Sequence, residues 1–264
     1  MPVAAHPVFV APANPKARIW RYTDLAKFLS LVDRSALFFP RLDKLEDPFE
    51  GSFTKSILQF ENLTFDDLTD DLKLQVMNEE TFRIIVGNNR QFREFAKTQR
   101  EITFVNSWYC NEHESAAMWS QYLRTQEGIA IQSTYERLCQ SLAGYEDFQV
   151  NIGMVNYIDY ESDSIPIGNA IYPTMYKRKS FEHEKELRAV IWTMQHGKNQ
   201  PGPENRFKDS SGLYVPVDIA TLVECVYLAP TAPSWLRDLI ESLLRRFGHL
   251  IPVVPSGLAD KAFY

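Results

Sequence analysis

The sequence predicts an α+β fold built on a mixed or antiparallel sheet. Strand-like segments occur early, from 17 to 41, and again late, from 102 to 228, and a helical block from 52 to 100 separates them. Alternating apolar residues identify the strands, and apolar residues at helical spacing identify the helices. Strands and helices that are segregated along a chain, as they are here, are typical of α+β proteins.

The chain has 264 residues, which is enough for one large domain or two small ones. No internal repeat or low-complexity tract divides it. We expect a single domain over 1–264, with 52–100 as a helical insertion within it. Prolines at 2, 7, 12 and 15 predict that 1–16 is an extended arm lying on the surface.

Composition narrows the class of protein. A hydrophobic content of 45% and a charged content of 23% are ordinary for a soluble globular protein. The net charge of -6 argues against general nucleic-acid binding, which needs a basic surface. Cys110, Cys139 and Cys225 are scattered, which indicates a reducing compartment. No apolar run approaches the roughly 20 residues that span a bilayer, so we expect a cytoplasmic protein without membrane contact.

The first elements have clear local signals. We predict a strand over 17–22, with Arg18, Trp20 and Tyr22 on one face and Arg21 on the other. Thr23 or Asp24 caps a helix that runs to about 32, and a second strand covers 36–41. The Asp-Pro and Gly signals predict a turn over 45–51 that packs down through two apolar residues, Leu45 and Phe49.

The helical block is predicted to hold two amphipathic helices. One begins after Thr64, its expected cap, and buries Phe65, Leu68, Leu72 and Val76. The other covers 81–100 and breaks at 87–89, where Gly-Asn-Asn interrupts the pattern.

The second half of the chain alternates between strands and short helices. We predict strands over 102–109, 128–132, 148–160, 213–217, 223–228 and 250–254. We predict helices over 112–123, 134–143 and 235–247. The segment 196–212, rich in Gly, Pro, Asn and Lys, is predicted to be a long exposed loop.

The late strand over 184–192 carries the most distinctive polar pattern. Glu184, Glu186 and Arg188 share one strand face, and same-face neighbours lie roughly 6.5–7 Å apart. That spacing allows two carboxylates to reach one ligand. The alternative is a solvated charged face with a cross-strand salt bridge, worth about 0–1 kcal/mol when exposed.

Several common sites are missing from the sequence. It has no P-loop, no G-x-G-x-x-G, no H-E-x-x-H, no paired Cys-x-x-Cys and no G-x-S-x-G, so zinc is not expected and no metal ligands are assigned. A basic run, Lys177-Arg178-Lys179, precedes the two glutamates. It is either a solvated loop or an anion site for phosphate, because Lys and Arg supply charge-assisted donors.

The order of several motifs resembles a large, mostly bacterial family catalogued as a domain of unknown function, DUF2971. The resemblance covers about 18–230. Its motifs are Trp20-Arg21-Tyr22-Thr23, Asp47-Pro48-Phe49-Glu50, Trp119-x-x-Tyr122 before Gly128-Ile129-Ala130-Ile131, and Lys179-x-Phe181-x-x-Glu184-x-Glu186-x-Arg188.

A looser pattern is similar to ADP-ribosyltransferases, which bind NAD in a split sheet. The shared pattern is an early strand with Arg and an aromatic residue, then a helix, and a late strand that opens with Glu-x-Glu. The resemblance implies that Glu186 stabilises an oxocarbenium-like transition state and that Glu184 orients the acceptor. It also implies that Arg21 or Arg18 holds phosphate and that Tyr22 packs near nicotinamide. The other candidate ligand-binding residues are Trp119, Tyr122, Lys179 and Arg188.

Three functional hypotheses stay open. The first is an NAD-consuming transferase or glycohydrolase, such as a bacterial toxin or phage-defence effector. The second is a non-catalytic module that binds a nucleotide, a phosphorylated ligand or a partner protein. In it, Glu184, Glu186 and Arg188 form an ion-pair network with Arg21 or Lys179 that holds the sheet together. The third is a nuclease, in which Asp47, Glu50, Glu184 and Glu186 bind magnesium through oxygen ligands.

Overall fold

The computed structural model confirms the predicted α+β class with a mixed sheet. It describes residues 6–122, 126–166, 169–196, 210–260 and 262. Within this part of the chain the main sheet has seven strands, in the order β11-β10-β4-β1-β3-β8-β5. Neighbouring strands are antiparallel except β10 and β11, which are parallel.

The strands of the main sheet come from both ends of the chain. They are β1 (Arg18–Asp24), β3 (Thr103–Cys110), β4 (Gly128–Thr134), β5 (Phe148–Met154), β8 (Glu186–His196), β10 (Cys225–Leu228) and β11 (Val253–Pro255). Two small sheets pair β2 (Ala36–Pro40) with β9 (Gly212–Pro216), and β6 (Asn156–Ile158) with β7 (Tyr176–Arg178).

Helices cover the main sheet and extend beyond it. They are α1 (Leu25–Arg34), α2 (Lys55–Phe60), α3 (Asp70–Val76), α4 (Glu79–Glu101), α5 (Ala116–Tyr122), α6 (Tyr135–Ser141), α7 (Ile219–Leu222) and α8 (Ser234–Arg246). Asp24 caps α1 by accepting a hydrogen bond from the backbone N–H of Lys27, so this predicted cap is confirmed.

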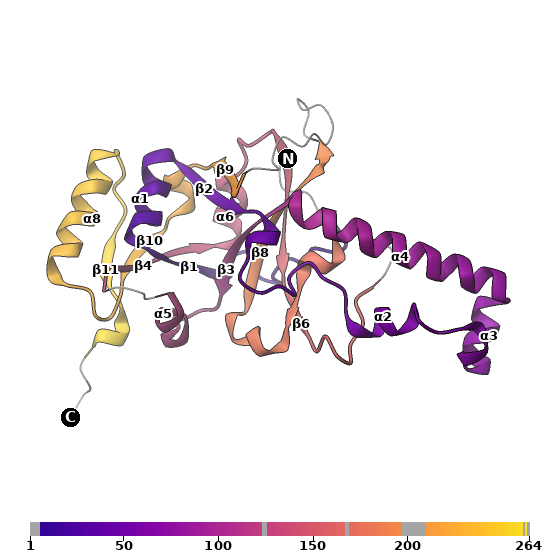
Figure 1. Ribbon diagram of the computed structural model, residues 1–264. Coiled ribbons are helices and arrows are strands. Elements are labelled where there is room, and N and C mark those ends of the chain that lie inside the picture. Colours follow the sequence, from indigo (N-terminus) through magenta and orange to yellow (C-terminus); the bar gives the residue numbers. More distant parts are fainter. Residues whose placement is uncertain (1–5, 123–125, 167–168, 197–209, 261, 263–264) are drawn as a thin grey trace.

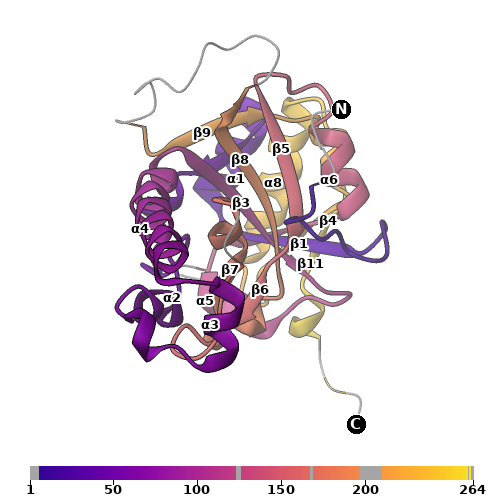
Figure 2. The same ribbon diagram turned by 90° about the vertical axis from the view of Figure 1, so that its right-hand side faces the viewer.

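The largest core lies on one face of the sheet. Ile19, Trp108 and Leu187 point into it from three adjacent strands, and side chains of α1, α6, α7 and α8 cover them. In Figure 2, α4 lies to one side of β8 and β5 and α6 lies to the other. The opposite face of the sheet carries two smaller apolar cores and, beside them, the polar side chains of the candidate site.

The described part of the predicted arm, residues 6–16, is mostly exposed but is anchored at two positions. Val8 and Phe9 are buried and pack into a second core with Val105 and Val190. The backbone N–H of Met154 donates to the carbonyl of Val10, so the arm lies along β5, the edge strand. Burial of apolar side chains and pairing with an exposed edge hold this segment in place.

Residues 52–100 hold α2, α3 and α4, which extend away from the sheet (Figure 1). The predicted break at 87–89 is wrong, because α4 is continuous from Glu79 to Glu101. Glycine within a helix costs only about 1 kcal/mol relative to alanine. Burial of Phe82, Asn89 and Ala96 along the same helix offsets that cost.

The prediction for the helix after Thr64 was wrong in two respects. The helix predicted after Thr64 begins later, because a 3-10 turn, η2 (Phe65–Asp67), precedes α3 and Thr69 is the helix cap. Leu72 is 37% exposed rather than buried.

Most of the loop predicted over 196–212 lies outside the described residues. Among the residues that the structure describes, no helix is long and apolar enough to cross a membrane.

Candidate functional site

Five charged side chains form a buried cluster on the face of β8 opposite the main core. They are Glu50, Lys177, Glu184, Glu186 and Arg188, and we call them the ion cluster. Each is less than 10% exposed. Three carboxylates face two cations, so the cluster carries a net charge of −1 when all its members are ionised.

Arg188 is the most enclosed member, with 0% exposure. Its Nε and Nη2 donate to the two carboxylate oxygens of Glu186 at 2.7 and 2.9 Å. Nη2 also donates to Glu50 at 2.5 Å, and Nη1 donates to the carbonyl of Thr174 at 2.7 Å. Every nitrogen of this guanidinium is therefore satisfied by protein. These bonds engage four of the five guanidinium N–H groups, so protein acceptors take up most of the donor capacity of Arg188.

Lys177 joins all three carboxylates. Its Nζ lies 2.5 Å from Glu184, 3.3 Å from Glu186 and 3.4 Å from Glu50. Burial alone would lower the pKa of Lys177, but Glu186 and Glu50 outweigh burial and raise it. The ammonium group occupies the space among the carboxylates that the nuclease hypothesis gives to magnesium. Within the described residues, no group of His, Cys, Asp and Glu side chains is arranged to hold a metal ion.

Glu186 is held ionised by its neighbours. Burial on its own would raise the pKa of this carboxyl group, but Arg188 and Lys177 outweigh burial and lower the pKa to about 2. A hydrogen bond from the Ser107 side chain contributes in the same direction. Glu186 is therefore an anion throughout the physiological pH range.

The geometry that brings Glu184 and Glu186 together is not the predicted one. Glu184 does not belong to the strand, because it ends the 3-10 helix η4 (Lys179–Glu184), and β8 begins at Glu186. Lys185 between them is left-handed, with φ 38° and ψ 51°. The two carboxylates nevertheless bind the same Nζ of Lys177, since the left-handed residue turns Glu184 back towards the face that carries Glu186.

Glu184 connects the ion cluster to α5. Its Oε1 accepts a hydrogen bond from Gln121 Nε2 at 3.1 Å. Gln121 Oε1 lies 3.4 Å from Nε2 of the exposed His183. Of the two glutamates, Glu184 is thus the one that faces the α5 side of the site.

The first strand meets this region where the sheet begins to part. β1 pairs with β4 at all seven positions, but it pairs with β3 only through Ile19 and Trp20. Beyond Trp20, β1 and β3 are no longer paired through their backbones. There the Arg21 side chain bridges the two strands, since its Nη1 donates to the carbonyl of Ser107 at 2.8 Å. Ser107 also hydrogen-bonds Glu186 through its side chain, so one residue of β3 joins both.

Arg21 has no carboxylate partner among the described residues. Its guanidinium carbon lies 5.9 Å from the centre of the Trp108 ring. Desolvation lowers the pKa of Arg21 to about 10, and the neighbouring Tyr122 opposes the shift. Arg21 is therefore a half-buried cation whose counter-charge is missing from the described protein.

Aromatic side chains border the same place. Tyr22 contacts Trp119 edge-on at 4.9 Å and stacks on Tyr122 at 6.4 Å between ring centres. Tyr122 is 41% exposed, whereas Tyr22 and Trp119 are buried. The pKa of Tyr122 is raised by burial and by Glu184 and Glu186, and it is lowered by Lys177 and Arg21. The acidic pair and the first-strand arginine therefore act on the same hydroxyl group.

Other candidates lie apart from this convergence. Arg18 is exposed at the start of β1, where its Nη1 donates to the carbonyl of Glu112 at 3.4 Å. Lys179 is exposed on η4. Arg178 forms an ion pair with Asp47 at 2.9 Å. Lys177 and Arg178 are already neutralised by carboxylates. Of the three basic residues predicted to form an anion site, Lys179 alone has no ion pair with a described residue.

Two members of the ion cluster were not predicted in their observed roles. Lys177 was assigned to a basic run, and Glu50 was proposed only as a magnesium ligand. The turn over 45–51 was expected to pack through Leu45 and Phe49. Leu45 does pack against the second core, but Phe49 is 36% exposed, and the buried acids of the turn are Asp47 and Glu50. The only sequence signal for Glu50 was its place in the Asp-Pro-Phe-Glu motif.

Comparison with known proteins gives a distant structural likeness. No protein-family model matches the chain, and a search of curated proteins finds no match either. The resemblance to the DUF2971 family therefore stays a prediction.

Three solved structures of the same protein resemble the fold at low identity. Thermus sp. 2.9 DarT in complex with NAD+ aligns with a TM-score of 0.41 and 8% identity, over 96% of this chain and 100% of that chain. The complex with carba-NAD+ gives 0.39 and 8%, over 92% and 96%. The complex with ADP-ribosylated ssDNA gives 0.38 and 9%, over 94% and 96%. At these scores the likeness carries no argument about activity or ligand.

Proposed function

We propose that this protein binds NAD where β1 and β3 part and cleaves its bond between nicotinamide and ribose, as a transferase or glycohydrolase. The observation that carries the proposal is Arg21, a desolvated guanidinium without a carboxylate partner in the described part of the chain. A cation in this state is stabilised by an anion from outside the protein, and a pyrophosphate matches the planar donor geometry of arginine.

The aromatic residues supply the next part of the proposed site. Tyr122, which is 41% exposed and neighbours Arg21, offers a ring face, and aromatic surfaces suit a planar base. Tyr22 stacks on Tyr122 and supports it. Trp119 packs against Tyr22 and fixes its position. Arg18 and Lys179 are exposed and lie apart from these residues, so the proposal assigns them no direct role.

The ion cluster supplies the electrostatic part. Cleavage of the glycosidic bond develops positive charge on the ribose, which a carboxylate stabilises. Glu186 stays ionised, and the cluster as a whole has one more carboxylate than cations. In this proposal Glu186 faces the ribose, Glu184 orients the acceptor, and Arg188 and Lys177 position the carboxylates.

Nicotinamide release from NAD tests the proposal. We expect the wild-type protein to release nicotinamide, and Glu186→Gln and Arg21→Gln each to reduce the rate by at least about 100-fold. Glu182→Gln, an exposed neighbour on η4, is the matched control and should retain the wild-type rate. Equal and negligible release by wild type and Glu186→Gln, with both proteins folded, would remove the enzymatic proposal.

A second candidate function follows from the burial of the cluster. Glu186 is 3% exposed and both of its oxygens are bound to cations, which is the arrangement of a structural network. In that case the protein is a non-catalytic module, and Arg21 binds a nucleotide or a phosphorylated group on a partner protein. Calorimetric titration distinguishes the two functions, because a module binds NAD or ADP-ribose through Arg21 without releasing nicotinamide.

A further inference from the structure

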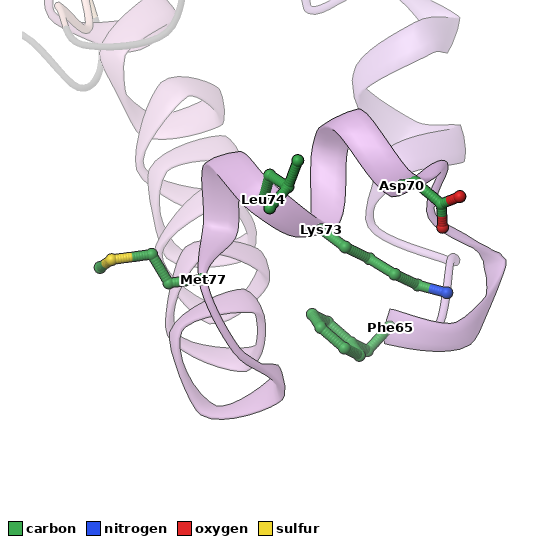
Figure 3. A pocket seen from close by; sticks show the side chains of 5 residues that line it. All are labelled: Phe65, Asp70, Lys73, Leu74 and Met77. Carbon is green, nitrogen blue, oxygen red and sulfur yellow. The ribbon is translucent and has the colours of Figure 1, made fainter.

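The end of the helical insertion exposes apolar side chains that no other part of the described chain covers. This segment, residues 63–84, is called the insertion tip, and it lies at the far end of the projection formed by α2, α3 and α4 (Figure 1). Leu74 is 79% exposed and Met77 is 75% exposed. Both line a hollow of about 610 Å³ together with Phe65, Asp70 and Lys73 (Figure 3).

The tip is held in shape by a small core of its own. Leu68, Val76 and Phe82 are buried together, and Phe60 and Phe65 pack against them. Leu74 and Met77 are therefore not needed to close that core. Met77 also has a φ of 65°, an uncommon backbone conformation for a residue other than glycine. Exposed apolar side chains on an ordered support are typical of protein interaction sites.

The insertion tip as a whole is strongly acidic, while the hollow itself is lined by one acid, Asp70, and one base, Lys73. The tip contains six carboxylates and two basic side chains, a net charge of −4. All six carboxylates are exposed: Asp66, Asp67, Asp70, Asp71, Glu79 and Glu80. The two cations are partly occupied, since Arg83 pairs with Glu79 at 2.6 Å and Lys73 lies over the ring of Phe65 at 5.8 Å. An acidic surface that also exposes apolar side chains, here called the acidic rim, suits a partner that is both basic and apolar.

We propose that the insertion tip is a docking surface for a basic amphipathic helix of a partner protein. Apolar residues of the partner helix occupy the hollow beside Leu74 and Met77, and Lys and Arg side chains of the partner helix meet the acidic rim. Methionine suits such a surface, because its flexible side chain adapts to different apolar partners. An amphipathic helix in an apolar groove is a common mode of recognition.

Charge excludes the main alternatives. Nucleic acids and anionic bilayers repel a surface with a net charge of −4. A second copy of this chain brings a net charge of -6, which opposes self-association through an acidic surface. This inference does not depend on the function proposed for the ion cluster, which belongs to another part of the fold.

A labelled synthetic peptide tests the proposal. The probe is a helical peptide of about 18 residues, or five turns, with Leu along one face and Lys elsewhere. Fluorescence anisotropy should show saturable binding to the full-length protein, weaker at higher NaCl. The double substitution Leu74→Ser with Met77→Ser should raise the Kd by about 10-fold or more. An otherwise identical peptide with Glu in place of Lys should not bind.

The matched control is Leu250→Ser. Leu250 is 92% exposed and follows α8, at the opposite end of the molecule from α3 (Figure 1). This change removes a similar exposed side chain and should leave the Kd unchanged. The proposal is overturned if the wild-type protein does not bind the peptide, if the tip and control variants bind alike, or if the Glu peptide binds as well. Light scattering that shows self-association lost in the tip variant would assign the surface to a second copy instead.

Discussion

Arg188 and Glu186 form a bidentate ion pair between two side chains of the same strand face, with nitrogen–oxygen distances of 2.7 and 2.9 Å. Such a pair is local, but the residues around it are not. Glu50, 138 positions earlier, completes the coordination of Arg188. Arg188 therefore ties the turn before α2 to β8, the strand beside the edge strand β5.

Loss of the charge should destabilise the protein far more at Arg188 than at Arg21. Arg188→Met leaves Glu186 and Glu50 buried with one fewer cation, so we expect the free energy of unfolding to fall by about 3–5 kcal/mol. Arg21→Met removes a desolvated cation and one hydrogen bond, and these effects oppose each other. We expect a change within about 1 kcal/mol. Urea denaturation of both variants measures the difference, and equal losses would contradict it.

Glu186 should make the protein sensitive to acid. Its pKa falls from the ordinary value of 4.5 to about 2 in the fold. A lowered carboxyl pKa adds stability that is fully present above pH 4.5 and is lost as the pH falls towards 2. The free energy of unfolding of the wild type should therefore decrease across that window more steeply than that of Glu186→Gln. Glu182→Gln should follow the wild-type curve. Parallel curves for wild type and Glu186→Gln would count against this role.

Gly153 should be essential for docking of the amino-terminal arm. A Cβ at this position would lie 2.7 Å from the Cα of Phe9, which is closer than packed atoms allow. We expect Gly153→Ala to displace the arm, expose Val8 and Phe9, and speed amide exchange in residues 8–10. Gly144→Ala is the matched control, because its Cβ would meet nothing within 4 Å. Hydrogen exchange detected by mass spectrometry separates the two variants, and identical exchange in both would refute the prediction.

Glu114 should hold α5 to the last strand. Its Oε2 accepts hydrogen bonds from Trp119 Nε1 at 2.8 Å and Ser256 Oγ at 2.6 Å, and its Oε1 accepts one from the backbone of Gly257 at 2.8 Å. Glu114→Leu leaves buried donors unpaired, at a cost of about 1–3 kcal/mol for each. We expect a lower melting temperature and faster amide exchange over 256–260.

The exposed Glu112, two positions away, provides the control for this test. Glu112→Leu should change neither the melting temperature nor the exchange over 256–260. Unchanged exchange in Glu114→Leu would show that other contacts hold the two segments together.

Local signals predicted most of the secondary structure. Asp24 as a cap and the alternation from 102 to 109 each depend on neighbours within a few residues, so the sequence alone reveals them. Gly87 misled the prediction, because its local preference is small beside the packing of α4.

The site was less accessible to sequence. Glu184, Glu186 and Arg188 were recognised as one group because they are close along the chain. The burial of Asp47 and Glu50 depends on Arg178 and Arg188, more than 130 residues away. The parting of β1 from β3 depends on strand register, which no short motif encodes. The unpaired state of Arg21 follows from that register and was therefore invisible in the sequence.

The left-handed backbone at Lys185 changes what the Glu-x-Glu pattern means in this chain. On a regular strand, the two carboxylates would lie side by side along one face. Here the left-handed residue between them directs both carboxylates to the same lysine amine. Residues with a branched β-carbon disfavour that backbone, while glycine or asparagine accommodates it. The backbone conformation of the middle residue of the motif therefore decides whether the two carboxylates bind one lysine.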